Sequence, residues 1–332
     1  MKILIILFLS ILSLSAQITY KSESEAKDKK HIVFVASDHE YRAEESCTAL
    51  ARILAKHNGY DCTVLYGVNP EGEITAGASD IKGLEALAKA DLMVIFTRFL
   101  DLPDDQMKHI DAYIKRGGPV VGLRTSSHAF KIPKGKTYSK YDFKSKDPKF
   151  EKGFGHQILG NTWVGHYGRN HKQGTRIKLI PEQKDHPILT GVKDNAFCYA
   201  GGYTGIADET FTVLANSQPL VTMKRDAAAD PEKRPMPCTW TRHYTAENGE
   251  KARVFHSTQG ASEDLIDPDY RRLIINGIFW AASDEANIKV DNNISFVGKY
   301  QPTTFNFAGH VKGVRPADLQ DMNSPIMPKK EQ

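Results

Sequence analysis

Short apolar segments alternate with helix-like segments through the first half of the chain, and this alternation is the strongest constraint on its fold. The sequence predicts strands over residues 31–37, 62–66, 92–97 and 119–123. The segments between them predict helices over residues 44–57, 82–90 and 103–116. Because parallel strands need long crossover connections, repeated strand–helix units predict an α/β fold, a parallel sheet with helices on both faces.

The second half departs from this alternation. Residues 125–174 show weak periodicity and are rich in Lys, Gly, His and aromatic side chains, which is typical of a functional insertion. Further strands, some of them antiparallel, are expected over residues 175–180, 211–215, 220–225, 238–244 and 253–258, followed by a helix over 268–283. We therefore expect one α/β domain over residues 31–285. Residues 286–332 would be a tail packed on the domain through Phe296, Tyr300, Phe305 and Phe307.

The N-terminus has the pattern of an export signal. Lys2 precedes an apolar run of about a dozen residues, and Leu14-Ser15-Ala16 offers a small-residue cleavage site. This run is shorter than the roughly 20 residues that cross a bilayer as a helix, and no later run is longer. We expect residues 1–16 to be a signal peptide and residues 17–30 a solvated lead-in linker, which makes the mature protein periplasmic or secreted without a membrane span. An uncleaved anchor is the alternative for the first segment.

Charge and cysteine spacing exclude several classes of protein. The formal charge of +4 is small for 332 residues and is spread along the chain, so neither nucleic acid nor an anionic membrane is an expected partner. Cys47, Cys62, Cys198 and Cys238 lack the paired spacing of a zinc site. Helix geometry places Cys47 and Cys62 about 15 Å apart, too far for a disulfide, whereas a pair between Cys198 and Cys238 stays open.

Polar and ionisable side chains follow three of the predicted parallel strands. They are Asp38, His39, Glu40, Tyr41 and Arg42 after the first strand, Arg98 after the third, and Arg124, Thr125, Ser126 and His128 after the fourth. Ligands of open parallel sheets bind beyond the carboxyl ends of the strands, so these groups are expected to converge. Plainer roles compete with this one: Asp38 could cap the following helix, His39 could be a surface histidine, and Arg98 could pair with Asp101.

Two further patterns bear on chemistry. Residues 119–124 have the outline of a nucleophile elbow, but its exposed position holds Arg124, which cannot be a nucleophile. Ser126 or Ser127 with His128 would make a serine hydrolase only if the side chains faced each other, which neighbours in sequence rarely do.

The insertion contributes His156, Trp163, His166 and His171. Their spacing matches no familiar metal pattern, so a divalent metal is an open alternative rather than an expected cofactor. Trp163 could stack on a sugar ring or pack in the core.

Several longer runs resemble the trehalose-utilisation (ThuA-like) family, in its exported subgroup. They are residues 37–46, 91–103, 122–130, 185–191, 239–242 and 270–281. The resemblance implies a class I glutamine amidotransferase-like fold, which is a flavodoxin-like parallel sheet with helices on both faces and added antiparallel strands. It also implies a role in carbohydrate use, on keto-sugars or glycosides. Arg124 stands where amidotransferases carry a cysteine, so their chemistry is not implied; Arg124 and Ala261 also replace two histidines found in many members of the family.

Together these features favour an exported enzyme that acts on a sugar derivative by hydrolysis, elimination or isomerisation. The candidate general acids and bases are His39, Glu40, His128 and His166. The candidate substrate-binding residues are Asp38, Tyr41, Arg42, Arg98, Arg124, Thr125, Ser126 and Trp163. One alternative is a non-catalytic protein that binds a small sugar or glycoside. Another is an interaction module, which predicts an exposed apolar patch and leaves the oligomeric state open.

Overall fold

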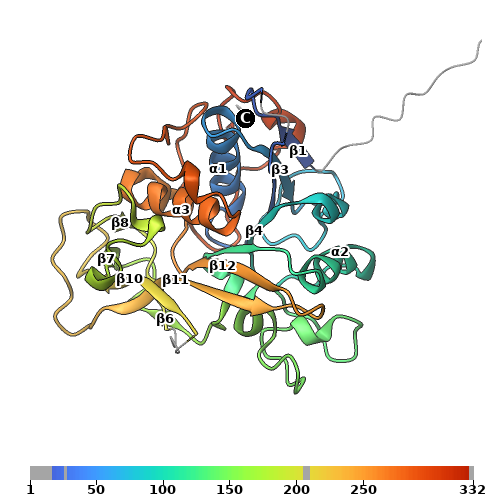
Figure 1. Cartoon of the computed structure of the whole chain (residues 1–332), viewed down its shortest axis with the longest axis horizontal. Helices are drawn as coiled ribbons and strands as arrows, with labels where there is room; N and C mark the ends of the chain where they lie inside the picture. The colour runs from blue at the N-terminus through green and yellow to red at the C-terminus, as the bar shows by residue number, and fades with distance from the viewer. Residues whose placement is uncertain (1–16, 26–27, 205–209, 329–332) are drawn as a thin grey trace, which may run out of the picture.

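The computed structural model describes residues 17–25, 28–204 and 210–328, so the predicted signal peptide lies outside the described residues. Ten strands form one mixed sheet in the order β1-β3-β2-β4-β5-β12-β11-β10-β7-β8, and helices pack against it (Figure 1). A separate two-stranded sheet joins β6 (His166–Tyr167) to β9 (Gly202–Tyr203).

The centre of the large sheet is parallel, as the alternation in the first half predicts. It contains β3 (Asp61–Tyr66), β2 (His31–Ser37), β4 (Leu92–Thr97), β5 (Val120–Leu123) and β12 (Lys251–Ser257). Ile32 of β2 pairs with Cys62 of β3 on one side and with Leu92 of β4 on the other. The strand order therefore reverses at β2, and the carboxyl ends of β2 and β4 mark the position at which open α/β sheets bind ligands.

Antiparallel strands extend both edges of this parallel centre. On one side lie β11 (Met236–Thr245), β10 (Thr212–Pro219), β7 (Thr175–Leu179) and β8 (Phe197–Cys198). On the other side β1 (Gln17–Tyr20) pairs with β3. The mixed α/β architecture is thus confirmed, with more antiparallel pairing than the first half of the sequence indicates.

Three expected segments differ from the structure. Residues 17–20 are not a solvated linker, because the alternating Ile18 and Tyr20 are buried in a strand at the sheet edge. The strand expected over residues 220–225 is wrong: only Leu220 forms a bridge, to Ala229, and the chain then turns back on itself. The helix expected over residues 82–90 is a 3-10 helix, η1 (Leu84–Lys89), which follows Gly83 at a φ of 87°.

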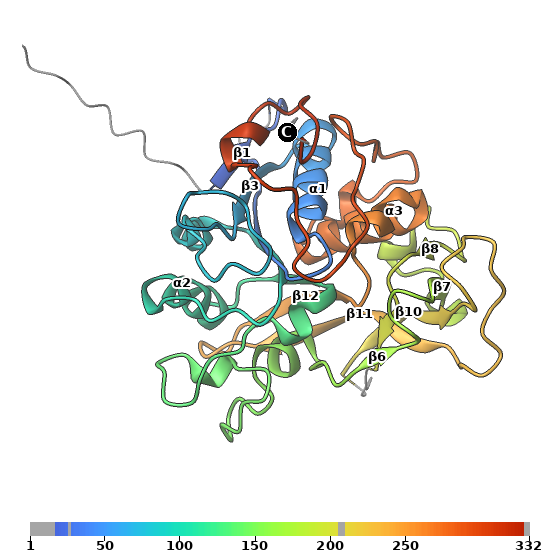
Figure 2. The ribbon, with the colours of Figure 1, turned by 180° about the vertical axis from the view of Figure 1, so that it is seen from behind.

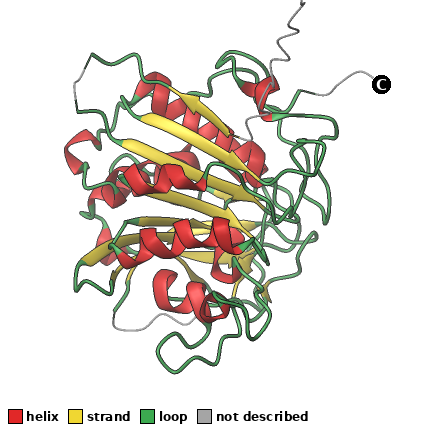
Figure 3. Ribbon diagram, turned by 90° about the vertical axis from the view of Figure 1, so that its right-hand side faces the viewer, coloured by secondary structure: helices red, strands yellow, loops and turns green. Residues whose placement is uncertain are grey.

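Helices cover both faces of the sheet (Figure 3). On one face α1 (Ala43–His57) and α3 (Pro268–Ala281) bury residues such as Leu50 and Ile274 against Phe34 and its neighbours. On the other face α2 (Asp104–Lys115) and η1 pack Met107 and Leu87 against the opposite side of the strands. The alternation of side chains along β2 separates the two cores, because successive residues of a strand point to opposite faces.

The insertion and the tail surround the carboxyl ends of the parallel strands. The insertion begins within the turn η2 (Arg124–His128) and contains the helical turn η4 (Gly155–Leu159) and β6. The tail runs past α1, as the red segment in Figure 2 shows, and Arg52 of α1 holds it by donating to the carbonyl of Leu319 at 2.9 Å. Within the described part of the chain, no helix is long and apolar enough to cross a membrane. All four cysteines are buried free thiols.

Candidate functional site

The turn after β5 is as sharp as the sequence predicts, but it does not expose Arg124. Arg124 has a φ of 47°, a left-handed conformation that is uncommon for a residue with a side chain. Its guanidinium is fully buried between the rings of Tyr41, at 4.0 Å, and Tyr203, at 4.3 Å. Its Nη1 donates to the carbonyls of Gly201 and Thr258. The expectation of an exposed elbow residue is therefore wrong, because neighbouring aromatic rings and carbonyl groups enclose the cation.

Asp38 fixes the turn that follows β2. Its Oδ1 accepts hydrogen bonds from the backbone amides of Glu40, at 2.6 Å, and Tyr41, and its Oδ2 accepts one from the Thr125 hydroxyl at 2.6 Å. Asp38 does not cap α1, because Arg42 precedes the first residue of that helix. Both carboxylate oxygens are engaged, so Asp38 and Thr125 tie the ends of β2 and β5 together.

Glu40 and Arg98 form a buried ion pair at the point where the strand order reverses. Arg98 Nη1 donates to Glu40 Oε2 at 2.7 Å, so Arg98 pairs with Glu40 rather than with Asp101. The other oxygen, Oε1, accepts from Asn170 at 2.9 Å and lies 2.7 Å from His171 Nε2. Burial opposes ionisation of Glu40, but the Arg98 charge and the hydrogen bond with His171 outweigh it and lower the pKa of the carboxyl. Glu40 is therefore an ionised anchor.

Two histidines of the cluster are held neutral. Burial, followed by the charges of Arg98 and Arg124, lowers the pKa of His128 well below its usual value. Burial and the Arg124 charge lower the pKa of His166 to about 4. A neutral imidazole carries one free lone pair, so each ring can accept a hydrogen bond near neutral pH. Burial also lowers the pKa of His39.

Aromatic contacts join these histidines into one cluster. The His128 ring lies 5.1 Å from Trp163 and 4.8 Å from Phe99, and Trp163 lies 5.9 Å from His166. His166 Nε2 lies 3.2 Å from the Tyr41 hydroxyl. The structure thus brings together predicted residues from the ends of β2, β4 and β5 and from the insertion.

Several buried donor groups in this cluster have no acceptor among the described residues. They are Arg98 Nε, Arg124 Nε and Nη2, Trp163 Nε1 and Gln259 Nε2. Buried polar groups without partners are rare in proteins, and each one costs free energy. All five atoms can only donate, while Asn170 Oδ1 beside Glu40 is an acceptor without a partner among the described residues, so the cluster is suited to a ligand that presents mainly oxygen acceptors.

The remaining predicted residues have structural partners. Ser126 is fully buried and donates to the Ile95 carbonyl at 2.6 Å. Arg42 donates to Asn306 of the tail at 3.2 Å. The Ser127 hydroxyl does contact His128, with 3.1 Å between Oγ and Nδ1, contrary to expectation. Ser127 is fully buried, as is His128 beside it.

Sequence reasoning missed Gln259, Tyr203 and the tail residue Phe305. Gln259 follows β12, and the rule that places ligands beyond strand ends would have found it if β12 had been placed in the parallel centre. Tyr203 reaches Arg124 because β9 pairs with β6, and Phe305 packs 5.1 Å from Tyr41. Neither pairing leaves a local signal in the sequence.

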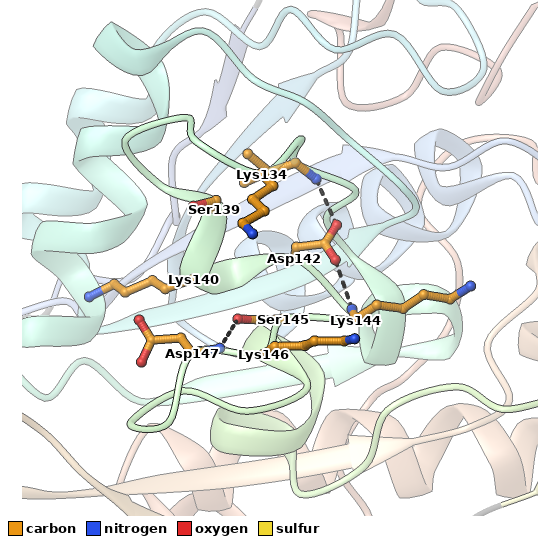
Figure 4. Close-up of a pocket in the computed structure, with 9 residues that line it drawn as sticks. Lys134, Ser139, Lys140, Asp142, Lys144, Ser145, Lys146 and Asp147 are labelled. Carbon is orange, nitrogen blue, oxygen red and sulfur yellow. Dashed lines mark hydrogen bonds between the residues drawn. The ribbon is translucent and has the colours of Figure 1, made fainter.

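Metal binding and the cavities of the molecule are the two remaining features that can mark a site. Among the described residues, no group of three or more His, Cys, Asp or Glu side chains could hold a metal ion. A cavity of about 570 Å³ opens in the insertion, and Figure 4 shows Lys134, Lys140, Lys144 and Lys146 around it. Asp142 shapes its wall by accepting from the amides of Ile132 and Lys144, both at 2.9 Å. None of the strand-end residues lines this cavity.

Comparison with models of known protein families identifies the family of this chain. The family model for ThuA, described as trehalose utilisation, matches residues 31–281. The chain belongs to the ThuA family. The match runs from β2 to the end of α3 and leaves the tail outside it. Family membership indicates a role related to carbohydrates.

Solved structures of ThuA-like proteins are similar to this chain. One from Parabacteroides merdae ATCC 43184 has 16% sequence identity and a TM-score of 0.47, covering 84% of this chain and 98% of that chain. Another, from Bacteroides uniformis ATCC 8492, has 13% identity and a TM-score of 0.49, covering 78% of this chain and 94% of that one. No curated protein matches the chain.

Proposed function

We propose that this ThuA-family protein is an exported enzyme that moves a proton on a keto-sugar or a keto-glycoside. The fold we propose for it is the class I glutamine amidotransferase-like one, with the signal peptide over residues 1–16 removed on export. The observation that carries the proposal is that one cluster contains two neutral histidines, His128 and His166, together with Arg98 and Arg124 donors that have no partner among the described residues. Bases and oxyanion donors are the two components that this chemistry requires.

The chemistry begins at a carbon next to the sugar carbonyl. A neutral imidazole of His128 or His166 takes the proton from that carbon, and the C–H electron pair shifts to place negative charge on the carbonyl oxygen. Guanidinium donors of Arg98 and Arg124 stabilise this oxygen, because they are already oriented by Glu40 and by backbone carbonyls. In an isomerisation the imidazolium returns its proton to the former carbonyl carbon, and the hydroxyl proton of the deprotonated carbon moves to the oxyanion, which leaves the carbonyl one carbon along. In an elimination the carbonyl re-forms, the C–O bond to a substituent on the next carbon breaks, and the imidazolium gives its proton to the departing oxygen.

The other predicted residues support these groups. Glu40 orients Arg98 and His171, Asp38 and Thr125 hold the β2 turn, and Ser126 holds the β5 turn. Tyr41 has a pKa raised by burial, so its hydroxyl stays protonated and can donate to a sugar oxygen or to His166. Trp163 and His39 border the cluster and are assigned to substrate contact.

Turnover of 3-keto-trehalose and methyl 3-keto-glucoside tests the proposal. We expect His166→Gln and His128→Asn each to lower kcat by about 10²-fold or more, the usual contribution of a positioned base. His109→Gln, on α2 away from the cluster, is the control and should match the wild type. If the wild type binds a sugar without turning it over, the protein is a binding protein; full activity in both cluster variants would remove these histidines from the mechanism.

A further inference from the structure

The tail crosses the site at residues 303–309, named here the tail strap. Its backbone is fastened at several points: Thr303 donates through its amide, at 3.0 Å, and its hydroxyl, at 2.7 Å, to Glu45, and the amide of Ala308 donates to the carbonyl of His39 at 2.6 Å. Ala308 has a φ of 58°, a conformation that a residue with a side chain keeps only when its surroundings hold it there. The strap is therefore a fixed wall beside the turn that follows β2.

The strap presents one aromatic ring inward and one outward. Phe305 is 1% exposed and packs against Tyr41 at 5.1 Å and His171 at 4.8 Å. Phe307, two residues on, is 65% exposed. Phe307 therefore buries little of its ring, contrary to the expectation from the sequence that it packs the tail onto the domain. Its exposure needs another explanation.

Phe307 lies beside the charged residues of the site. Its ring is 6.0 Å from the His39 ring with an interplanar angle of 23°, and the Arg98 guanidinium lies 5.5 Å from its centroid. Arg98 also lies 5.2 Å from the Phe99 ring, which in turn is 6.3 Å from Trp163. The Arg98 guanidinium thus lies near both the Phe307 and the Phe99 ring, and the Phe99 ring in turn lies near Trp163.

We infer that Phe307 is a sugar-stacking platform, which packs its exposed ring on the apolar C–H face of a pyranose whose oxygens reach Arg98. This inference rests on the proposed function and deepens it, because it assigns the subsite that holds the sugar ring. Pyranose rings have an apolar face and a polar rim, and aromatic walls with a few placed polar groups are the usual lining of small-molecule sites. The tail lies outside residues 31–281 that the family model matches, so this subsite belongs to the tail of this chain.

Binding of 3-keto-trehalose and methyl 3-keto-glucoside to the full mature chain tests the platform. We expect Phe307→Ala and Phe307→Leu to weaken binding and to raise KM by about fivefold or more, with kcat changed much less, because the ring holds the sugar away from the reacting carbon. Phe307→Trp should restore wild-type affinity. The control is Val290→Ala, another tail residue that is 66% exposed, which should bind as the wild type does.

The outcomes separate this inference from the proposed function. If the wild type binds and converts the sugars while Phe307→Ala does so with unchanged KM, the platform is refuted and the proposed function stands. If Phe307→Leu binds the sugars with wild-type affinity, an aromatic ring is not needed at this position and the platform is refuted. If the wild type neither binds nor converts either sugar, both the platform and the proposed function are overturned. Thermal melting of each variant should stay at the wild-type value, because the ring is exposed.

Discussion

Glu44 is a buried carboxyl whose ionisation should control stability near neutral pH. It lies in the first turn of α1, 5% exposed, and its Oε1 has no hydrogen-bond partner among the described residues. Burial, reinforced by the neighbouring charge of Glu45, raises the pKa of Glu44 from 4.5 to about 8. The folded protein therefore keeps a proton that the unfolded chain releases above about pH 4.5.

The difference between the folded and unfolded pKa of Glu44 sets the sign and size of its effect on stability. The raised pKa favours the folded state fully below the unfolded value, and that advantage is lost as pH rises toward the folded value. Each pH unit in this window costs about 1.4 kcal/mol, so the wild type should lose about 2 to 3 kcal/mol between pH 5 and pH 7 through Glu44 alone. Glu44→Gln removes the titration, so the variant should gain that much over the wild type across the same range.

Urea unfolding at pH 5, 6 and 7 measures the effect. The difference in unfolding free energy between Glu44→Gln and the wild type should grow with pH, while other titrating groups cancel because both proteins share them. Glu85→Gln, an exposed substitution on η1, is the control and should show no such growth. A pH-independent difference for Glu44→Gln would refute the argument that this carboxyl stays protonated in the folded protein.

Three further results are expected. The pH profile of kcat/KM on a keto-sugar should keep its plateau below pH 6 and fall only as pH drops through about 4, where His166 gains a proton; a midpoint near 6.5 would contradict a depressed pKa for this histidine. Gly277→Ala should lower unfolding free energy by about 1 to 3 kcal/mol in urea titrations despite the better helix propensity of alanine, because its Cβ would come within 2.5 Å of the Phe255 ring; equal stability would mean that the ring has room to move. The four buried thiols should react with a thiol reagent such as Ellman's reagent only after unfolding, and rapid labelling of the native protein would show that a cysteine is accessible.

The sequence predicted the part of the site that depends on strand topology. Asp38, Arg98 and Arg124 each follow an apolar run, and parallel strands deliver whatever follows them to one edge of the sheet. The ion-pair and hydrogen-bond partners of each residue could not be predicted from strand topology. Arg98 pairs with Glu40, whereas Asp101 pairs with Lys136 at 2.6 Å, and only the three-dimensional arrangement decides between the two acids.

Long-range packing positions the site residues that the sequence did not predict. Tyr203 and Phe305 reach the site through a short strand pairing and through the tail, neither of which has periodicity in the sequence. The burial of Arg124 depends on rings from two distant segments, so its enclosure could not be read from the apolar strand before it. Residues 17–20 illustrate the reverse case, because the alternation of Ile18 and Tyr20 was present but too short to distinguish a strand from a linker.

A crystal structure of the protein soaked with 3-keto-trehalose tests the central claim most directly. We expect one ordered sugar at the carboxyl ends of β2, β4 and β5, with its carbonyl oxygen within hydrogen-bond distance of Arg98 or Arg124 and a reacting carbon facing His128 or His166. An ordered sugar bound elsewhere, for example in the lysine-lined cavity of the insertion, with these four side chains untouched, would contradict it.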